Sequence, residues 1–156
     1  MVKNIKEGHK TSHNIVGAAG EYFVAAEISR RGAIATITPR NVLGLDILAS
    51  SIDGRRHVGI QVKTKSAGRD WPLGNKAILN PPEIFYVFPN LSGEVIEYYI
   101  IPSSVVFKIV EGEFQEYILH PRRDGNPRLT RLRVFRAKEM QTMTDYKNNW
   151  DKLNIF

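Results

Sequence analysis

The stretch LDILASSIDGRRHVGIQVKTK, residues 45–65, decides the fold, because two apolar runs flank a turn signal. The pair Asp53-Gly54 is typical of a two-residue loop in a β-hairpin. With this pair as the loop, opposed positions of the two strands always add up to 107. Asp46 therefore faces Gln61 in a predicted pair of antiparallel strands.

The two faces of this predicted hairpin differ in chemistry. Successive side chains of a strand point to opposite faces. Asp46 and Gln61 share one face, with Cβ atoms about 4.5–5.5 Å apart and Lys63 at the diagonal position. An aspartate among apolar residues loses hydration unless something compensates, although a half-buried strand with one wet face is the alternative. The opposite face gathers Leu45, Ile47, Ala49, Val58, Ile60 and Val62.

Helical spacing in the segment before the hairpin predicts a helix over residues 14–31. Asn14 is a suitable cap for its start, and Gly32 for its end. Glu21 and Glu27 both fall at the edges of the apolar stripe, and periodicity does not choose between them. The stripe consists of Ile15, Ala18, Ala19, Tyr22, Phe23 and Ala26.

The segments after the hairpin predict more strands and helices. Gly and Pro punctuate residues 66–83, which predicts a loop. Pro102 begins a short predicted helix that ends at Gly112. Apolar runs predict strands at residues 33–38, 84–89 and 94–101. The last predicted helix docks through Tyr146, Trp150 and Leu153.

Length and composition are those of one folded domain. The chain has 156 residues, 42% hydrophobic and 24% charged. We expect a single α/β domain over residues 1–156, with a mixed central sheet flanked by helices and a flexible basic tail at residues 1–13. The absence of cysteine excludes disulfides and thiolate zinc sites. Without a secretory signal or an apolar run of about 20 residues, the sequence predicts a cytoplasmic protein and no membrane contact.

The net charge of +6 is concentrated in one basic segment, residues 121–138, where Asp124 alone opposes seven basic residues. Arginine forks match phosphate oxygens in pairs, so the segment predicts a polyanionic partner. A solvated hairpin kept soluble by charge is the alternative. The basic residues are Arg122, Arg123, Arg128, Arg131, Arg133, Arg136 and Lys138.

The polar face of the hairpin offers the donor atoms of a divalent-cation site. Mg²⁺ and Mn²⁺ accept carboxylate, amide and backbone carbonyl oxygens. Asp46, the side-chain oxygen of Gln61 and the carbonyl of Val62 therefore predict a partial metal shell. Lys63 beside it would orient or deprotonate an attacking water and offset charge on a scissile phosphate.

The order GAAGEYFVAAE, LGLDILA and IQVKTK resembles the PD-(D/E)XK nuclease superfamily, especially its Holliday junction resolvase-like and restriction-endonuclease-like branches. The similarity covers residues 14–65. It implies a three-layer restriction-endonuclease-like core and Mg²⁺-dependent hydrolysis of DNA. By position, Asp46 matches the first metal-binding acid, Gln61 the second acid and Lys63 the lysine. Glu21 matches a first-helix glutamate, which implies a catalytic role and metal binding through water; Glu27 is the weaker match.

The sequence departs from this pattern at three places. Leu45 stands where the superfamily's name places proline. Gln61 replaces Glu or Asp, and a neutral amide binds a divalent cation less strongly than a carboxylate does. Residues 66–83 lack the helix expected between the third and fourth core strands.

Further contacts to nucleic acid are predicted, with DNA preferred to RNA as the partner and a homodimer left open. Arg40, Asn41 and Lys65 are candidates for phosphate contacts, with solvated positions as the alternative. Trp71 either stacks on a base or caps the core. Two rival functions remain: a nucleic-acid-binding module of the same fold without catalysis, and a protein-interaction domain whose basic surface meets an acidic partner.

Overall fold

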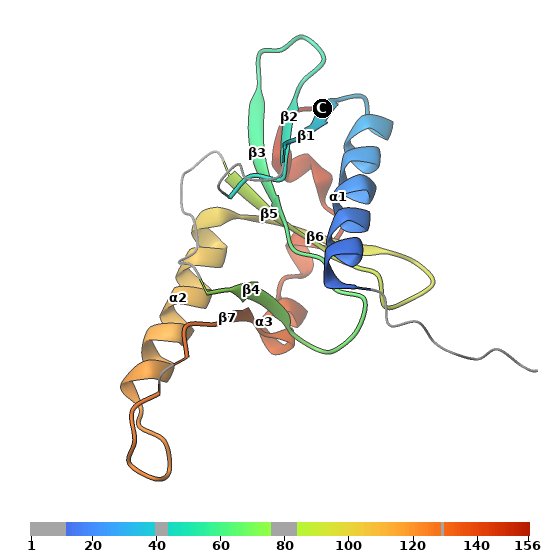
Figure 1. Ribbon diagram of the computed structural model, residues 1–156. Coiled ribbons are helices and arrows are strands. Elements are labelled where there is room, and N and C mark those ends of the chain that lie inside the picture. The colour runs from blue at the N-terminus through green and yellow to red at the C-terminus, as the bar shows by residue number, and fades with distance from the viewer. Residues whose placement is uncertain (1–11, 40–43, 76–83, 129) are drawn as a thin grey trace, which may run out of the picture.

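The computed structural model describes residues 12–39, 44–75, 84–128 and 130–156 (Figure 1). They form an α/β fold with a mixed five-stranded sheet, in the order β1-β2-β3-β5-β6, and a two-stranded sheet of β4 and β7. The strands are β1 Ile34–Ile37, β2 Ile47–Ser50, β3 His57–Val62, β4 Trp71–Gly74, β5 Ile84–Asn90, β6 Glu97–Pro102 and β7 Arg133–Phe135. The helices are α1 His13–Arg30, α2 Ser103–Leu119 and α3 Ala137–Thr142, and the 3-10 turns are η1 Thr144–Tyr146 and η2 Trp150–Leu153.

The register of the β2–β3 hairpin is the predicted one, with Ile47 paired to Ile60. The loop is wider than predicted, because the N–H of Ser51 donates to the carbonyl of Arg56 at 2.9 Å and residues 52–55 lie beyond this bond. A four-residue loop and a two-residue loop with the same centre give the same register. The predicted register is therefore confirmed, although the loop is longer than predicted.

Beyond the hairpin, the sheet combines both strand directions. β1, β2 and β3 form an antiparallel meander. β5 is parallel to β3, and β6 is antiparallel to β5. The prediction of a loop over residues 66–83 is wrong where β4 lies, because this segment forms a strand that pairs with β7. Its partner lies far along the chain, so no local pattern could indicate this strand.

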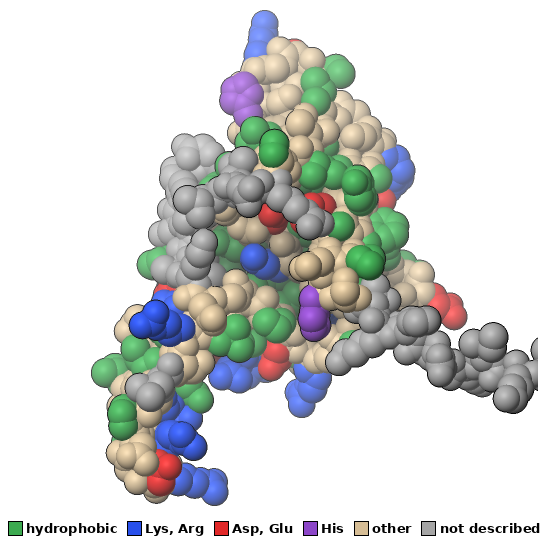
Figure 2. All heavy atoms as spheres, in the orientation of Figure 1, with side chains coloured by type: hydrophobic (Ala, Val, Ile, Leu, Met, Phe, Trp, Pro, Cys, Tyr) green, Lys and Arg blue, Asp and Glu red, His purple; other side chains and the backbone are tan. Residues whose placement is uncertain are grey.

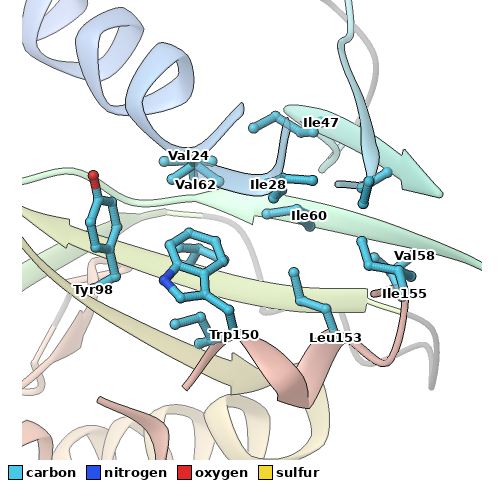
Figure 3. Close-up of a cluster of buried hydrophobic side chains, with 14 residues drawn as sticks. Val24, Ile28, Ile47, Val58, Ile60, Val62, Tyr98, Trp150, Leu153 and Ile155 are labelled. Atoms are coloured by element: carbon cyan, nitrogen blue, oxygen red, sulfur yellow. The ribbon is translucent and has the colours of Figure 1, made fainter. Parts of the chain in front are cut away.

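Each face of the five-stranded sheet packs against its own hydrophobic core. On one face, Val24 and Ile28 of α1 meet Ile60 and Val62 of β3, and residues of the C-terminal segment join them (Figure 3). On the other face, α2, α3 and the small sheet pack against β5 and β6. We call these the α1 face and the α2 face.

The ends of α1 lie close to the predicted ones. Ser12 rather than Asn14 is the cap, and its Oγ accepts the N–H of Ile15 at 3.4 Å. Residues 12 and 13 thus belong to the helix start and not to a flexible tail, while residues 1–11 lie outside the described residues. Gly32 follows the helix with φ +88°, a conformation that glycine adopts readily.

The predicted buried stripe of α1 is wrong. The buried residues are Gly20, Val24 and Ile28. Ile15, Tyr22 and Phe23 of the predicted stripe are 62%, 68% and 43% exposed. Apolar residues surround the whole helix, so their spacing could not select the face that packs against the sheet.

Helix α2 runs through Gly112, so the predicted end at this glycine is wrong. Its last two turns leave the body of the molecule and lead into a projecting loop, visible at the lower left of Figure 1. We call residues 120–132 the arm; Leu129 is its one residue outside the described part. The arm carries most of the predicted basic segment.

The C-terminal segment forms η1 and η2 instead of the single predicted helix. Trp150 and Leu153 are buried against the α1 face, as predicted for docking residues, but Tyr146 packs against the core of the α2 face instead. The ring of Trp150 packs edge-on against Tyr98 with 5.1 Å between centroids. No helix in the described part of the chain is long and apolar enough to cross a membrane.

Candidate active site

Asp46 lies directly before β2, at an irregular point of the hairpin. Its N–H donates to the carbonyl of Ile60 at 2.8 Å, and Ile60 is also the partner of Ile47. Two residues thus oppose one, as in a β-bulge. The side chain of Leu45 consequently packs over Gly59 on the α2 face. The prediction that Leu45 lies on the α1 face is therefore wrong.

The structure brings Asp46 and Gln61 together, as the register predicts. Gln61 Nε2 donates to Asp46 Oδ2 at 2.5 Å, and the N–H of Val62 donates to the same oxygen at 2.7 Å. The carboxylate thus takes the bond that a longer β2 would make with Val62. Because the N–H and C=O of a strand residue point the same way, the Val62 carbonyl is also directed toward this side.

Lys63 follows β3 and is held in place by its backbone N–H, which donates to the carbonyl of Val87 at 2.9 Å. Burial lowers the pKa of the Lys63 ammonium, and the charges of Asp46 and then Glu21 partly offset this effect. The two carboxylates and the ammonium therefore act on one another electrostatically. Three of the four predicted catalytic side chains carry charge, and all three share this site.

The structure separates the two glutamates that periodicity left open. Glu27 forms ion pairs with Arg30 and Arg31 near the end of α1. Glu21 is half-buried, and its charge acts on Lys63. Glu21 is therefore the glutamate of α1 that belongs to the site.

Gly20 explains how α1 approaches the site so closely. A Cβ atom at this position would lie 1.8 Å from the hydroxyl oxygen of Thr64, the residue after Lys63. Sequence reasoning missed this contact, although the glycine directly before Glu21 was a usable signal. The missing side chain lets α1 touch the end of β3 and so positions Glu21.

The donor set matches a hard cation in kind. Asp46 and Glu21 supply carboxylates, and Val62 supplies a carbonyl. Gln61 now presents its amide nitrogen to Asp46, so a half-turn of the amide would be needed to present its oxygen. Within residues 12–39, 44–75, 84–128 and 130–156, no group of three His, Cys, Asp or Glu side chains is placed to hold a metal ion.

The candidates that follow β3 have internal contacts. Lys65 Nζ donates to the carbonyl of Arg69 at 2.9 Å and lies 3.6 Å from the ring centroid of Trp71. Trp71 is only 3% exposed, so it occupies the core position rather than a stacking position. Burial lowers the pKa of Lys65, partly offset by Asp70. The predicted phosphate contacts Arg40 and Asn41 lie outside the described residues.

Three arginines of the basic segment anchor the arm. Arg133 Nε lies 3.1 Å from Glu111 Oε1, and these side chains are only 12% and 11% exposed. Arg128 donates to the carbonyl of His120 at 2.9 Å and to the hydroxyl of Tyr117 at 2.8 Å. The remaining anchor pairs Arg136 with Glu113 at 3.3 Å.

The other three arginines of the segment point into solvent. Arg122 is 3.8 Å from Asp124, and both are exposed. Arg123 and Arg131 are exposed and have no side-chain bond within the described residues. Figure 2 shows Lys and Arg side chains along the arm, and acidic beside basic side chains in the central hollow of the same face.

Comparisons with known proteins returned no match to any protein-family model, any curated protein or any solved structure. The function of this site therefore has to be inferred from its own residues. These combine two carboxylates, an amide, a directed carbonyl and the ammonium of a half-buried lysine at one end of β3.

Proposed function

We propose that the chain is a divalent-metal-dependent phosphodiesterase that hydrolyses DNA, built on a three-layer core like that of restriction endonucleases. The observation that carries the proposal is the cluster at Asp46, whose carboxylate accepts from both Gln61 and Val62 next to Lys63. Oxygen donors beside a half-buried lysine suit the hydrolysis of a charged ester.

The order and direction of the elements support this proposal. A helix, an antiparallel meander of three strands and a next strand parallel to the third occur here as α1, β1, β2, β3 and β5. This agrees with the resemblance to PD-(D/E)XK nucleases on which the sequence prediction rests. The connection from β3 to β5 contains β4 and shows no helix in its described residues, 63–75.

Mg²⁺ or Mn²⁺ would be held by Asp46, the Val62 carbonyl and the rotated amide of Gln61, with Glu21 reaching it through water. When bound, the ion supplies Lewis-acid polarisation of the phosphate. The geometry of the site favours an oxygen-binding ion, since its described donors are two carboxylates, an amide and a carbonyl.

Lys63 has two tasks in this proposal. Its ammonium offsets the negative charge that grows on the phosphate as water attacks phosphorus and the P–O ester bond breaks. Because burial lowers the pKa of Lys63, its ammonium also releases a proton more easily than that of an exposed lysine. The charges of Asp46 and Glu21 favour the charged form of this ammonium.

The test is cleavage of supercoiled, branched and single-stranded DNA with Mg²⁺, Mn²⁺ or EDTA. We expect metal-dependent cleavage that Asp46→Asn abolishes, while Asp145→Asn, an exposed aspartate in η1, changes nothing. Gln61→Glu should bind Mg²⁺ more tightly in calorimetry and keep or raise the activity. No cleavage of any of these DNAs by the wild type or by Gln61→Glu would overturn the enzyme proposal.

A DNA-binding module without catalysis is the second candidate. It is favoured by one observation: the amide nitrogen of Gln61, not a second carboxylate, faces Asp46. This candidate expects DNA affinity without turnover. The remaining rival, a domain that binds an acidic protein through the arm, expects no DNA binding at about 0.15 M salt, where exposed charges more than about 8 Å apart are largely screened.

A further inference from the structure

Helix α2 separates the candidate active site from the arm by a fixed length. Its first residue follows Pro102, which pairs with Phe85 of β5, and Phe85 pairs with Ile60 of β3. The start of α2 is therefore two strand spacings, about 10 Å, from the strand that holds Gln61. The 17 residues of α2 then add about 25 Å at 1.5 Å per residue.

The arm is firmly attached to the far end of this helix. Arg128 bonds the last turn of α2 through His120 and Tyr117, and its guanidinium lies 4.2 Å from the Tyr117 ring centroid. Nearer the body, the Arg133–Glu111 pair fixes the chain that returns from the arm, with Arg133 3.9 Å from the ring of Phe114. These bonds tie the chain to α2 at Arg128 and again at Arg133, where it returns from the arm.

The exposed charges of the arm therefore lie at a defined distance from the site. Arg122 and Arg123 directly follow the end of α2, roughly 25–35 Å from the Gln61 strand, whereas Arg131 lies nearer the body, two residues before Arg133. Figure 2 shows the Lys and Arg side chains of the arm on the same face as the central hollow. One strand of duplex DNA places a phosphate about every 3.4 Å, so the distance from the Gln61 strand to Arg122 and Arg123 spans about seven to ten base pairs.

We propose that the arm binds the backbone of double-stranded DNA about seven to ten base pairs to one side of the phosphodiester at the Asp46 site. The inference rests on the proposed function for the position of that phosphodiester. The preferred substrate is then a duplex that extends at least this far on one side.

The stiffness of a duplex favours it over a single strand. Double-stranded DNA has a persistence length of about 150 base pairs, so a duplex held at the site already reaches the arm. A flexible single strand would lose conformational freedom to span the same gap.

The experiment measures the affinity of the full chain for labelled duplexes of 6, 10, 14 and 20 base pairs without metal, by fluorescence anisotropy. We expect an increase on the order of tenfold between roughly 6 and 14 base pairs, where the arm gains its phosphate contacts. Arg123→Ala/Arg131→Ala should remove this step. Arg55→Ala/Lys152→Ala, which removes the same charge from exposed positions elsewhere, should keep it.

Three results would overturn the inference: equal affinity for short and long duplexes, a step that survives in the Arg123→Ala/Arg131→Ala variant, or single strands of matched length that bind as tightly. Cleavage with Mg²⁺ is measured separately on the same DNAs. A length step without cleavage would contradict the proposed hydrolysis and still support the arm contact. Cleavage without a length step would support the proposed hydrolysis and contradict the arm contact.

Discussion

At the scale of single residues, the partial burial of the Lys63 ammonium destabilises the fold, while its charge suits the proposed hydrolysis. Its side chain is half-buried, and the attraction of Asp46 and Glu21 offsets only part of the hydration that its ammonium loses, as its lowered pKa indicates. A residue kept at such a cost is typical of functional sites. Replacement by an apolar side chain of similar length should therefore separate folding from chemistry.

We predict that Lys63→Met abolishes DNA cleavage without lowering the melting temperature. The apolar side chain avoids the burial cost of the ammonium, so the melting temperature should stay the same or rise. Affinity for DNA should change less than about threefold, since the exposed arginines supply most ground-state binding. Lys108→Met, on the exposed side of α2, is the control. A large loss of DNA affinity in Lys63→Met would contradict the assignment of Lys63 to catalysis.

The pH dependence of stability gives a second test of Lys63. Its folded-state pKa lies below the unfolded value, so between the two the unfolded chain binds more protons and stability rises with pH. Burial of the Lys63 charge destabilises the fold fully at pH values below the folded-state pKa. This destabilisation disappears as the pH approaches the unfolded-state pKa of about 10.4. The excess unfolding free energy of Lys63→Met over wild type should thus shrink as urea melts move from pH 7 to pH 10. A constant difference would show that burial does not act on this charge.

At the scale of elements, two glycines of α1 give a matched comparison. Gly17 has nothing within 4 Å of an added Cβ, whereas Gly20 meets Thr64 at once. Gly17→Ala should stabilise the fold by about 1 kcal/mol through helix propensity. Gly20→Ala should destabilise it by about 1–3 kcal/mol and reduce cleavage, because overpacking pushes Glu21 away from Lys63. Thermal melts and cleavage rates check both, and equal effects would contradict the close approach of α1.

The return of the chain from the arm depends on the Arg133–Glu111 pair. Arg133→Ala leaves a carboxylate in a nearly buried position, so we expect a loss of about 3 kcal/mol in urea unfolding. Arg131→Ala, two residues away and exposed, should cost less than about 0.5 kcal/mol. A small loss at Arg133 would mean that the pair does not anchor the arm.

The sequence predicted those elements whose signals are local. The Asp53-Gly54 turn was enough to bring Asp46 opposite Gln61. The buried face of α1 could not be predicted, because apolar residues occur all around this helix. β4 and β7 depend on a distant pairing, and the bulge that moves Leu45 depends on a backbone bond to Ile60. The sequence alone could not distinguish the six arginines of the basic segment from one another. Partners such as Glu111 distinguish the arginines that anchor the arm from those that are exposed.

At the scale of the whole molecule, the free charges of the arm set the salt dependence of DNA binding. Each phosphate contact on duplex DNA contributes a slope of about −0.9 to the plot of log affinity against log salt. Arg123→Ala/Arg131→Ala should therefore reduce the magnitude of the slope by about 1.8, measured between 50 and 200 mM salt. An unchanged slope would place the DNA surface elsewhere. Arg133 is unsuitable for this test, because its loss would also disturb the arm.

The burial of the C-terminal segment also has a consequence for how the protein is made. Trp150, Leu153 and Ile155 are 3%, 1% and 1% exposed and complete the core between α1 and the sheet. A ribosome adds about 5–20 residues per second, so it makes this segment about 2–10 s after the end of β6. Until then, the nascent chain holds strands whose α1 face is incompletely covered. Chaperones that shield apolar surface during translation should therefore engage this protein late, and stalled or shortened chains should be the forms that aggregate.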